Sequence, residues 1–379
     1  MLKPGHYDVC IVGGGLAGLA LSIQMAKLGY TVSLFEKEQY PFHKVCGEYI
    51  SMESWNFIES LGVPLAQMNL PHITKLQVSA PNGNLLTAPL PLGGFGISRY
   101  LLDDTLKNCA IKNGVLVIEN SKVEDVQYTG DGFSVQTRQG IFTSTLCFGS
   151  FGKRSNLDIK WKRPFVLHKN NKLSNYVGIK YHIITKAAED SIALHNFKNG
   201  YCGISKIEDN KFCLCYLTNA ANLAAHQNSI QQMEQAVLKK NKHLRQLLEQ
   251  SEQLFTQPIS ISQISFNKKA QVQDHIILLG DAAGMISPLC GNGMSMALHA
   301  AKIAAALGHL FLQNKLSRQQ LEATYVQQWK KQFASRLAAG RLIQSFFGKV
   351  WITNIFITCM KRMPFLTRWL IRQTHGQPF

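Results

Sequence analysis

Residues 7–36 read YDVCIVGGGLAGLALSIQMAKLGYTVSLFE, and this stretch decides the fold of the chain. Residues 7–12 predict a short apolar strand, residues 19–28 a helix, and residues 30–35 a second strand. A G-x-G-x-x-G motif lies at the turn between the first strand and the helix. This order of elements predicts a Rossmann-like α/β domain that binds a dinucleotide.

Each part of the glycine motif has a physical role. Gly13 allows the tight turn, Gly15 lets the backbone approach a pyrophosphate, and Gly18 lets the helix pack close to the strand. Leu16 and Ala17 lie between these glycines, where N–H groups at the start of the helix would face the anion. The motif therefore predicts a pyrophosphate at this helix N-terminus.

An acidic residue ends the second strand of the same unit. Glu36 follows the glycine turn by about 20 residues, where a carboxylate can accept hydrogen bonds from a ribose 2′-OH. A 2′-phosphate would be repelled by this carboxylate. The site therefore favours FAD or NAD over NADP.

Length and composition are those of a globular protein. With 379 residues, 46% of them hydrophobic and 17% charged, the chain can form one large or two modest domains. We see no run of 18 apolar residues and no signal-peptide pattern, so we expect a cytoplasmic protein without a spanning helix. Nine scattered cysteines without a C-x-x-C pair indicate reduced thiols, and we expect no metal site and no disulfide framework.

The formal net charge is +17, and much of the excess lies near the C-terminus. No acidic residue follows Glu322, whereas basic and aromatic residues interleave after it. This pattern suits contact with anionic lipid at the inner face of the membrane, and a helical cap on the cofactor domain is the alternative. We expect no nucleic-acid partner, because basic charge alone is not specific. The tail residues are Phe346, Phe347, Lys349, Val350, Trp351, Ile355, Phe356, Lys361, Arg362, Phe365, Arg368, Trp369, Leu370 and Arg372.

The remaining patterns divide the chain into three regions. We expect a hairpin over 72–88, a helix from Ser98 to about Asn113, a meander over 123–148, antiparallel strands over 176–218 and one amphipathic helix over 229–249. Residues 89–96 read as a Pro/Gly loop, and residues 294–313 and 317–347 as helices. The expected domains are a discontinuous FAD-binding domain (1–75, 98–160 and 267–325), a substrate domain (76–97 and 161–266) and a C-terminal helical region (326–379).

Further motifs follow in a recognisable order. They are Lys44-Val45-Cys46-Gly47, Ser98-Arg99 at a helix start, a turn over 149–155, Gly280-Asp281, and Pro288 with Gly291-Asn292-Gly293. With the glycine motif and Glu36, they resemble the superfamily of FAD-dependent aromatic hydroxylases (group A flavin monooxygenases) and geranylgeranyl reductases. The resemblance implies a p-hydroxybenzoate hydroxylase-like α/β fold, in which a Rossmann-like FAD domain joins an antiparallel-sheet substrate domain.

The resemblance also implies how FAD is held. Glu36 would hold the adenosine ribose, Arg99 the pyrophosphate or ribitol, and Asp281 the ribitol, while the turn 288–293 would face the flavin ring. A helix N-terminus there would stabilise the negative charge of reduced flavin. The cofactor-binding residues are therefore expected to be Gly13, Gly15, Leu16, Ala17, Gly18, Glu36, Lys37, Lys44, Cys46, Gly47, Arg99, Val123, Gly280, Asp281, Pro288, Gly291, Asn292, Gly293 and Met294.

Departures from the family leave the electron donor open. Phe151-Gly152 stands where many hydroxylases have Asp-Gly, so NADH or NADPH is a donor still to be established. The Tyr-x-Trp-x-Phe-Pro motif of archaeal geranylgeranyl reductases and the Trp-x-Trp-x-Ile-Pro motif of tryptophan halogenases are both missing. No second G-x-G-x-x-G follows a strand, which argues against a separate NAD domain.

Three residues are candidates for catalysis, each with a structural alternative. Cys46 is a candidate redox or substrate-positioning thiol, or a small buried thiol. Glu48 is a candidate proton donor or acceptor, or a solvated loop acid. Tyr201 either lines the substrate pocket or belongs to the core of a strand.

These residues suit three functions. The first is a monooxygenase that hydroxylates a lipophilic aromatic substrate through a flavin C4a-hydroperoxide. The second is a reductase or dehydrogenase acting on a lipid C=C bond, which suits Cys46 and the basic apolar tail better. The third is a flavin-binding electron-transfer protein without a small-molecule substrate.

Overall fold

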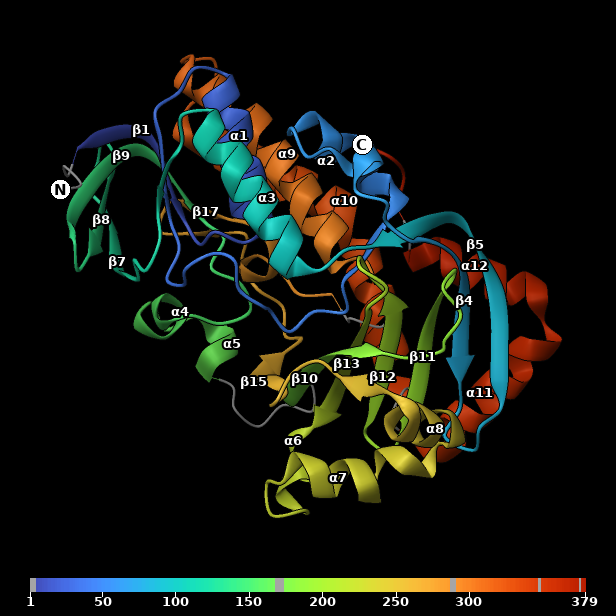
Figure 1. The fold of residues 1–379 in the computed structure, drawn as a ribbon. Coiled ribbons are helices and arrows are strands. Elements are labelled where there is room, and N and C mark those ends of the chain that lie inside the picture. The colour runs from blue at the N-terminus through green and yellow to red at the C-terminus, as the bar shows by residue number, and fades with distance from the viewer. Residues whose placement is uncertain (1–4, 168–173, 287–290, 347–348, 375) are drawn as a thin grey trace.

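The N-terminal unit forms as its sequence predicts. The computed structural model describes residues 5–167, 174–286, 291–346, 349–374 and 376–379. In it, β1 (His6–Val12) and β2 (Val32–Phe35) pair in parallel, and α1 (Leu16–Lys27) connects them. The first sheet has the order β16-β17-β9-β1-β2-β6, with β7 and β8 extending from β9 (Figure 1). The glycine-rich turn lies at its carboxyl edge, where Rossmann-like sheets bind ligands.

Two glycines of the motif are required by close backbone contacts. A Cβ on Gly13 would lie 2.6 Å from the Ser150 carbonyl, and the φ of Gly13 is +106°. A Cβ on Gly18 would lie 2.1 Å from the Gly13 oxygen. Helix α1 can therefore approach the sheet only with glycine at both positions.

The rest of the first sheet comes from three distant parts of the chain. Its outer helices pack pairwise, α1 against α9 and α3, and α10 against α9. These elements are α3 (Arg99–Lys112), β6 (Leu116–Ile118), β7 (Val123–Tyr128), β8 (Phe133–Thr137), β9 (Gly140–Gly149), β16 (Val272–Gln273), β17 (Ile276–Leu278), α9 (Gly293–Leu312) and α10 (Arg318–Phe346). The expected helix N-cap is confirmed, since the Ser98 side chain accepts a hydrogen bond from Leu101 N at 3.1 Å.

A second sheet lies beside the first, in the order β14-β10-β13-β12-β11-β4-β5-β3, with β15 beside β10. Its pairs are antiparallel except for β11 with β4, which run parallel, so the expected antiparallel sheet is in fact mixed. Its strands are β3 (Tyr49–Ser51), β4 (His72–Ser79), β5 (Leu85–Gly96), β10 (Ser174–Ile184), β11 (Ser191–Phe197), β12 (Gly200–Lys206), β13 (Phe212–Asn219), β14 (Glu252–Gln253) and β15 (Ile259–Ser265).

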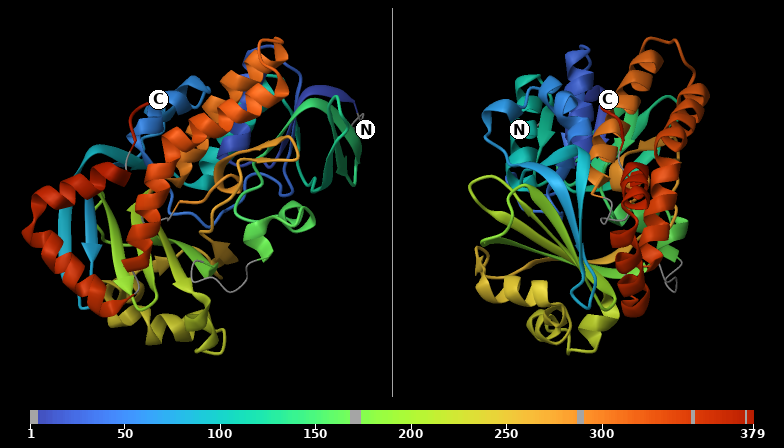
Figure 2. Two further views of the ribbon diagram at one scale, coloured as in Figure 1. Left: turned by 180° about the vertical axis from the view of Figure 1, so that it is seen from behind. Right: turned by 90° about the vertical axis from the view of Figure 1, so that its right-hand side faces the viewer.

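Helices cover both sides of the second sheet. Figure 2 shows α11 (Val350–Arg362) and α12 (Pro364–Thr374) along one side. On the other side, α7 (Ile230–Ala236) and α8 (Lys242–Gln250) pack over an apolar cluster that includes Ile179, Tyr181 and Tyr216. Short helices connect these parts: α2 (Trp55–Ser60), α4 (Asn156–Lys160), α5 (Pro164–Leu167) and α6 (Ala220–Ala224).

Two local expectations are wrong. The helix expected over 229–249 is divided, because Asn241 caps α8 and its amide also donates to Ser79, Ala80 and Asn196. Tertiary hydrogen bonds thus override the helical periodicity. Residues 89–96, expected as a loop, continue β5; an irregularity opposite Ile73 and Lys75 accommodates the prolines of this stretch.

Helix α9 is the one described helix whose length and apolar composition would suffice to cross a membrane. More than half of that stretch is buried, and α9 packs between α1 and α10. These contacts are those of a core helix.

The close approach at Gly18 makes a stability prediction. Gly18→Ala should lower the free energy of unfolding by about 2 kcal/mol or more, because the new methyl group meets a backbone oxygen that cannot move freely. Urea denaturation followed by circular dichroism measures the change. Gly47→Ala is the matched control, since a Cβ there meets no atom within 4 Å. Equal stability of the two variants would show that α1 does not need this contact.

Candidate functional site

Two cations face the glycine-rich turn. A Cβ on Gly15 would lie 3.8 Å from Arg99 Nη2 and 4.0 Å from Lys44 Nζ. No described side chain caps α1, and its first turn holds no acidic residue. Free N–H groups and two positive charges therefore meet at Gly15, which suits a pyrophosphate.

Both cations are held in place by Asp103. Arg99 donates two hydrogen bonds of 2.7 Å to its carboxylate, and Lys44 Nζ lies 3.0 Å from Oδ2. Burial opposes ionisation of Asp103, but Arg99 and Lys44 hold the pKa of its carboxyl below the usual value. The carboxylate is thus a fixed anchor that orients both cations.

Glu36 lies at the end of β2, where its sequence position predicts it. The buried carboxylate accepts hydrogen bonds from Gly14 N at 3.0 Å and Glu38 N at 3.2 Å. Lys44 Nζ lies 3.9 Å from Oε2. These bonds fix Glu36 beside the glycine turn, at the place where a ribose would follow the pyrophosphate.

The start of α9 is a second helix N-terminus in this site. Gly291 has a φ of +65° and Asn292 is fully buried, and among the described residues no side-chain hydrogen bond caps the helix. Asp281 lies nearby in a short 3-10 turn that begins at Gly280, and both residues line a small cavity with Gly293. Pro288 lies outside the described residues.

The other expected cofactor residues differ in their exposure. Leu16 and Ala17 are buried in the first turn of α1, and Val123 is buried at the start of β7. Lys37 is exposed and pairs with the neighbouring Glu38. Met294 follows Gly293, and its sulfur lies 3.6 Å from the Cys46 sulfur.

These residues fit FAD. The uncapped start of α1 with Arg99 and Lys44 suits the pyrophosphate, Glu36 suits the ribose, and the uncapped start of α9 suits the flavin ring. When bound, FAD would supply two-electron redox chemistry at this edge of the sheet.

The loop 44–47 connects this site with the second sheet. All four of its carbonyl oxygens accept a hydrogen bond from a side chain elsewhere in the chain. The donors are Lys180 to Lys44 (3.2 Å), Lys153 to Val45 (3.3 Å), Cys213 to Cys46 (3.2 Å) and Ser205 to Gly47 (3.1 Å). The loop is thereby fixed, and its Cys46 side chain lies partly exposed beside α9.

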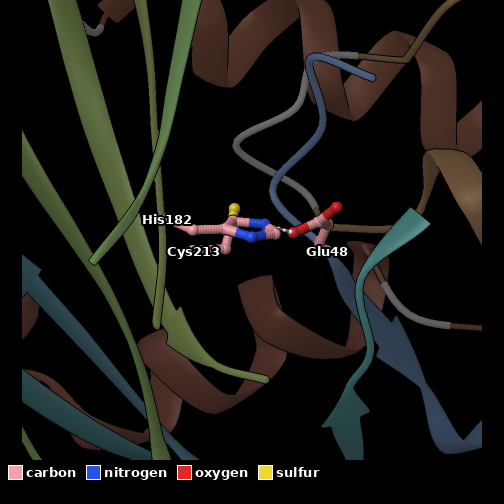
Figure 3. Close-up of side chains that lie close together, drawn as sticks. All are labelled: Glu48, His182 and Cys213. Atoms are coloured by element: carbon pink, nitrogen blue, oxygen red, sulfur yellow. Dashed lines mark hydrogen bonds and ion pairs between the residues drawn. The ribbon is translucent and has the colours of Figure 1, made fainter. Parts of the chain in front are cut away.

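Glu48 follows this loop and is fully buried, with a φ of +55°. Figure 3 shows its carboxylate pointing at His182 of β10 with Cys213 of β13 alongside. Lys180 Nζ lies 2.5 Å from Oε1, His182 Nε2 donates to Oε2 at 2.7 Å, and Arg99 N donates to Oε1 at 2.7 Å. The alternative of a solvated loop acid is therefore wrong: Glu48 joins the loop, α3 and the second sheet.

The charges in this network stabilise one another. Burial opposes ionisation of Glu48, but Lys180 and the hydrogen bond from His182 hold its pKa below the ordinary value. Burial also opposes the charge on Lys180, and Glu48 raises its pKa instead. Burial, Lys180 and His182 lower the pKa of the adjacent His43 to about 4, so that its imidazole is neutral.

The face of the second sheet that meets the loop has three rows of side chains. Strand register and alternation define them as His182, Cys213 and Ser205, then Lys180, Cys215 and Gly203, then Gly178, Leu217 and Tyr201. The first row contacts the loop. The third row is apolar, and Tyr201 is buried there in a cluster with Met285, Ile357 and Met360. Tyr201 thus lies on the same sheet face as the Glu48 network, two rows away.

Glu48, His182 and Cys213 also bring three metal-ligand types together, with ligand atoms within 4.8 Å of one another. Lys180 already occupies the Glu48 carboxylate, and Cys213 donates its thiol hydrogen to Cys46 O. Burial and Glu48 raise the pKa of Cys213 well above its usual value, which disfavours the thiolate that a metal needs. We therefore describe these residues as a hydrogen-bonded network.

The sequence alone does not mark Lys180, His182, Ser205 or Asp103 as part of this site. Asp103 follows Arg99 by four residues, a spacing that predicts a helical ion pair. The strand residues had no such signal, since Glu48 is separated from Lys180 by 132 positions. Only the pairing of the sheet brings them together.

Comparisons with known proteins agree with this geometry. A family model described as an NAD(P)-binding Rossmann-like domain matches residues 11–45. The chain is similar to conditioned medium factor receptor 1 of Dictyostelium discoideum, with 23% identity over 90% of this chain and 70% of that protein. It is also similar to digeranylgeranylglycerophospholipid reductase of Methanococcus vannielii, with 22% identity over 86% of this chain and 82% of that protein.

Solved structures share the fold over nearly the whole chain. A flavin-dependent brominase, Bmp2, aligns with a TM-score of 0.78 and 20% identity, over 97% of this chain and 93% of that one. A geranylgeranyl bacteriochlorophyll reductase-like protein from Thermoplasma acidophilum aligns with a TM-score of 0.79 and 16% identity, over 100% of this chain and 97% of that one. The expected fold class and the resemblance drawn from the motifs are confirmed.

The position of Lys44 makes a binding prediction. Lys44→Met should weaken FAD binding by about tenfold, because it removes one of the two cations that face Gly15. Titration of flavin-free protein with FAD, followed by flavin fluorescence, measures the dissociation constant. Lys107→Met is the control, since Lys107 belongs to the same helix but pairs with Asp104 and not with Asp103. An unchanged constant in the Lys44 variant would remove Lys44 from the cofactor site.

The Glu48–Lys180 pair makes a stability prediction. Lys180→Met should cost about 3 kcal/mol or more, because it leaves a buried carboxylate without its ammonium partner. The double variant Glu48→Gln with Lys180→Met should cost less than the sum of the single variants, as a double-mutant cycle in urea would measure. The half-exposed pair Lys75–Asp190 is the control, with coupling of about 0–1 kcal/mol. Additive effects at the buried pair would refute the coupling.

The same pair gives the sign of an acid effect. Since the pKa of Glu48 is lowered on folding, its contribution is present above the ordinary value of 4.5. It is lost as the pH falls through the lower pKa of the folded state. Wild type should therefore lose more stability than Glu48→Gln in this acid range.

Proposed function

Because the chain has the fold and the glycine-rich motifs of FAD-dependent oxidoreductases, we propose that it binds FAD and reduces a C=C bond of a lipophilic substrate, or forms one by dehydrogenation. The observation that carries this proposal is the fixed loop 44–47, which holds the partly exposed Cys46 thiol at the start of α9. The relative from Methanococcus vannielii, named as a reductase of a geranylgeranyl lipid, supports the substrate class.

Cys46 is suited to the proton that such a reaction needs. Reduction of a C=C bond adds a hydride to one carbon and a proton to the other, and FAD supplies only the two-electron step. The thiol can donate the proton, which breaks the S–H bond, and solvent then reprotonates the sulfur. Lys180 donates a hydrogen bond to the carbonyl oxygen of Lys44, so a fixed ammonium group lies beside the loop that carries this thiol.

Glu48 acts in this proposal as a positioning residue. Both of its carboxylate oxygens are occupied by Lys180, His182 and the Arg99 backbone, so the carboxylate has no place for a substrate proton. Its bonds instead set the height of the Cys46 loop above the second sheet. Tyr201 has no direct role in this proposal, because it packs in the core with Met285, Ile357 and Met360.

A monooxygenase acting on a lipophilic aromatic compound is the second candidate. The uncapped start of α9 favours it, because an N-terminus there would stabilise negative charge on reduced flavin. The sulfur pair counts against it. Cys46 and Met294 would both face activated oxygen at 3.6 Å from each other, and a thiol and a thioether are readily oxidised.

The role of Cys46 gives the experiment that tests the reductase proposal. Under argon, dithionite-reduced wild type should add two hydrogen atoms to a geranylgeranyl lipid, as mass spectrometry would detect. Cys46→Ala should lower the rate about 100-fold while flavin reduction stays unchanged, because only proton transfer is lost. Dithionite makes the test independent of whether NADH or NADPH is the natural donor.

Cys109→Ala is the matched control, since this half-buried thiol lies on α3 beside Gly62. Full activity of both variants would remove Cys46 from the mechanism. Product that forms only with oxygen, and carries an oxygen atom from it, would replace the reductase proposal with the monooxygenase.

A further inference from the structure

The outer faces of α11 and α12 carry large apolar side chains that the fold leaves uncovered. Trp351 is 68% exposed, Phe365 79% and Trp369 50%. On α11 the exposed positions Trp351, Ile355 and Cys359 follow one another at four-residue intervals, so they form one stripe. Such a stripe on an outer helix face is the signature of an interaction surface.

Basic side chains accompany this apolar stripe. On α12, Phe365, Arg368, Trp369 and Arg372 are all exposed at spacings of three and four residues, so aromatic and basic groups share one face. Lys349, Lys361 and Arg362 are exposed on or beside α11. None of these five cations forms an ion pair with a carboxylate in the part of the chain that the structure describes.

The inner faces of the same helices are occupied. Thr353, Ile357 and Met360 of α11 are buried, and Ile357 and Met360 pack in the cluster that contains Tyr201. The β4–β5 turn fixes the edge of α11 through Asn82 N to Asn354 (3.3 Å) and Asn84 to Thr358 (3.3 Å). Packing therefore determines which face of α11 points outward.

We propose that the outer faces of α11 and α12 dock on the surface of an anionic lipid bilayer. The cations have no acidic partner within α11 and α12, and no acidic residue follows Glu322 in the sequence. Negative lipid headgroups complement this charge, and the exposed tryptophan and phenylalanine side chains suit the headgroup boundary. A protein partner would need a matching acidic and apolar face, whereas a bilayer offers both properties to any orientation of the stripe.

The docking face of α11 lies close to the apolar third row of the second sheet. One layer of helix, α11, separates the docking face from Tyr201, Leu217 and Met285. The docking face and the third row thus lie on opposite sides of one helix. The docking rests on the charge and exposure of the outer face and does not depend on the proposed function.

Vesicle binding by the full chain tests the docking without any turnover. The protein should bind vesicles that contain about one third phosphatidylglycerol at least about tenfold more tightly than phosphatidylcholine vesicles, with the difference lost at high salt. Co-sedimentation measures the bound fraction. Equal binding to both kinds of vesicle, or none to either, would overturn the proposal.

Two double variants separate the contributions of charge and aromatic rings. Arg368→Gln with Arg372→Gln, and Phe365→Ser with Trp369→Ser, should each weaken binding by about tenfold. The matched controls are Lys112→Gln with Lys198→Gln, and Leu28→Ser with Ile141→Ser, which change exposed residues elsewhere. Controls that weaken binding as much as the test variants would show that the effect is not local to α11 and α12.

The remaining outcomes name other occupants. A dimer that the aromatic variant dissociates, with no vesicle binding, would assign the face to a second copy of the chain and overturn the proposal. Equal retention on heparin and on anionic vesicles would show binding to any polyanion and overturn it as well. If the wild-type protein binds anionic vesicles but shows no reductase activity, the proposed function is refuted and the docking proposal stands.

Discussion

The buried ion pair between Glu48 and Lys180 is the constraint on which the site depends. Both side chains are fully buried, and the nitrogen and oxygen lie 2.5 Å apart. Taking two charges out of water is costly, and the cost is offset only because hydrogen bonds from His182 and Arg99 N complete the network. The pair fixes the distance between the FAD-side loop and the second sheet. This distance determines where Cys46 lies.

The side chains on this face of the second sheet change from polar at one end to apolar at the other. Near the loop, polar side chains bind backbone carbonyls and leave Cys46 as the partly exposed thiol. In the middle of the face, Gly203 has no side chain and Cys215 has a small one. Toward α11, Leu217 and Tyr201 make it apolar. The polar end therefore holds the loop that carries Cys46, whereas the apolar end holds α11 against the sheet.

The sequence was informative where the physical signal is local. The glycine motif, Glu36 and the Ser98 cap each depend on a few neighbouring residues, and all lie where expected. It failed where distant strands decide the outcome: Glu48 read as a loop acid, although residues on β10 bury it, and Asn241 divides a helix through contacts with β4 and β11. Lys180 and His182 gave no signal in the sequence, because alternation along a strand does not show which face meets a cofactor.

The proposed reduction of a lipid C=C bond can be followed by the absorbance of the purified protein through anaerobic reduction and readmission of air, with a polyisoprenoid lipid present. A bound oxidised flavin should bleach on reduction, transfer its electrons to the lipid before air enters, and show no oxygen-adduct band afterwards. A transient adduct band that precedes reoxidised flavin would contradict it. Failure of the protein to bind flavin at all would contradict the assignment of the whole site.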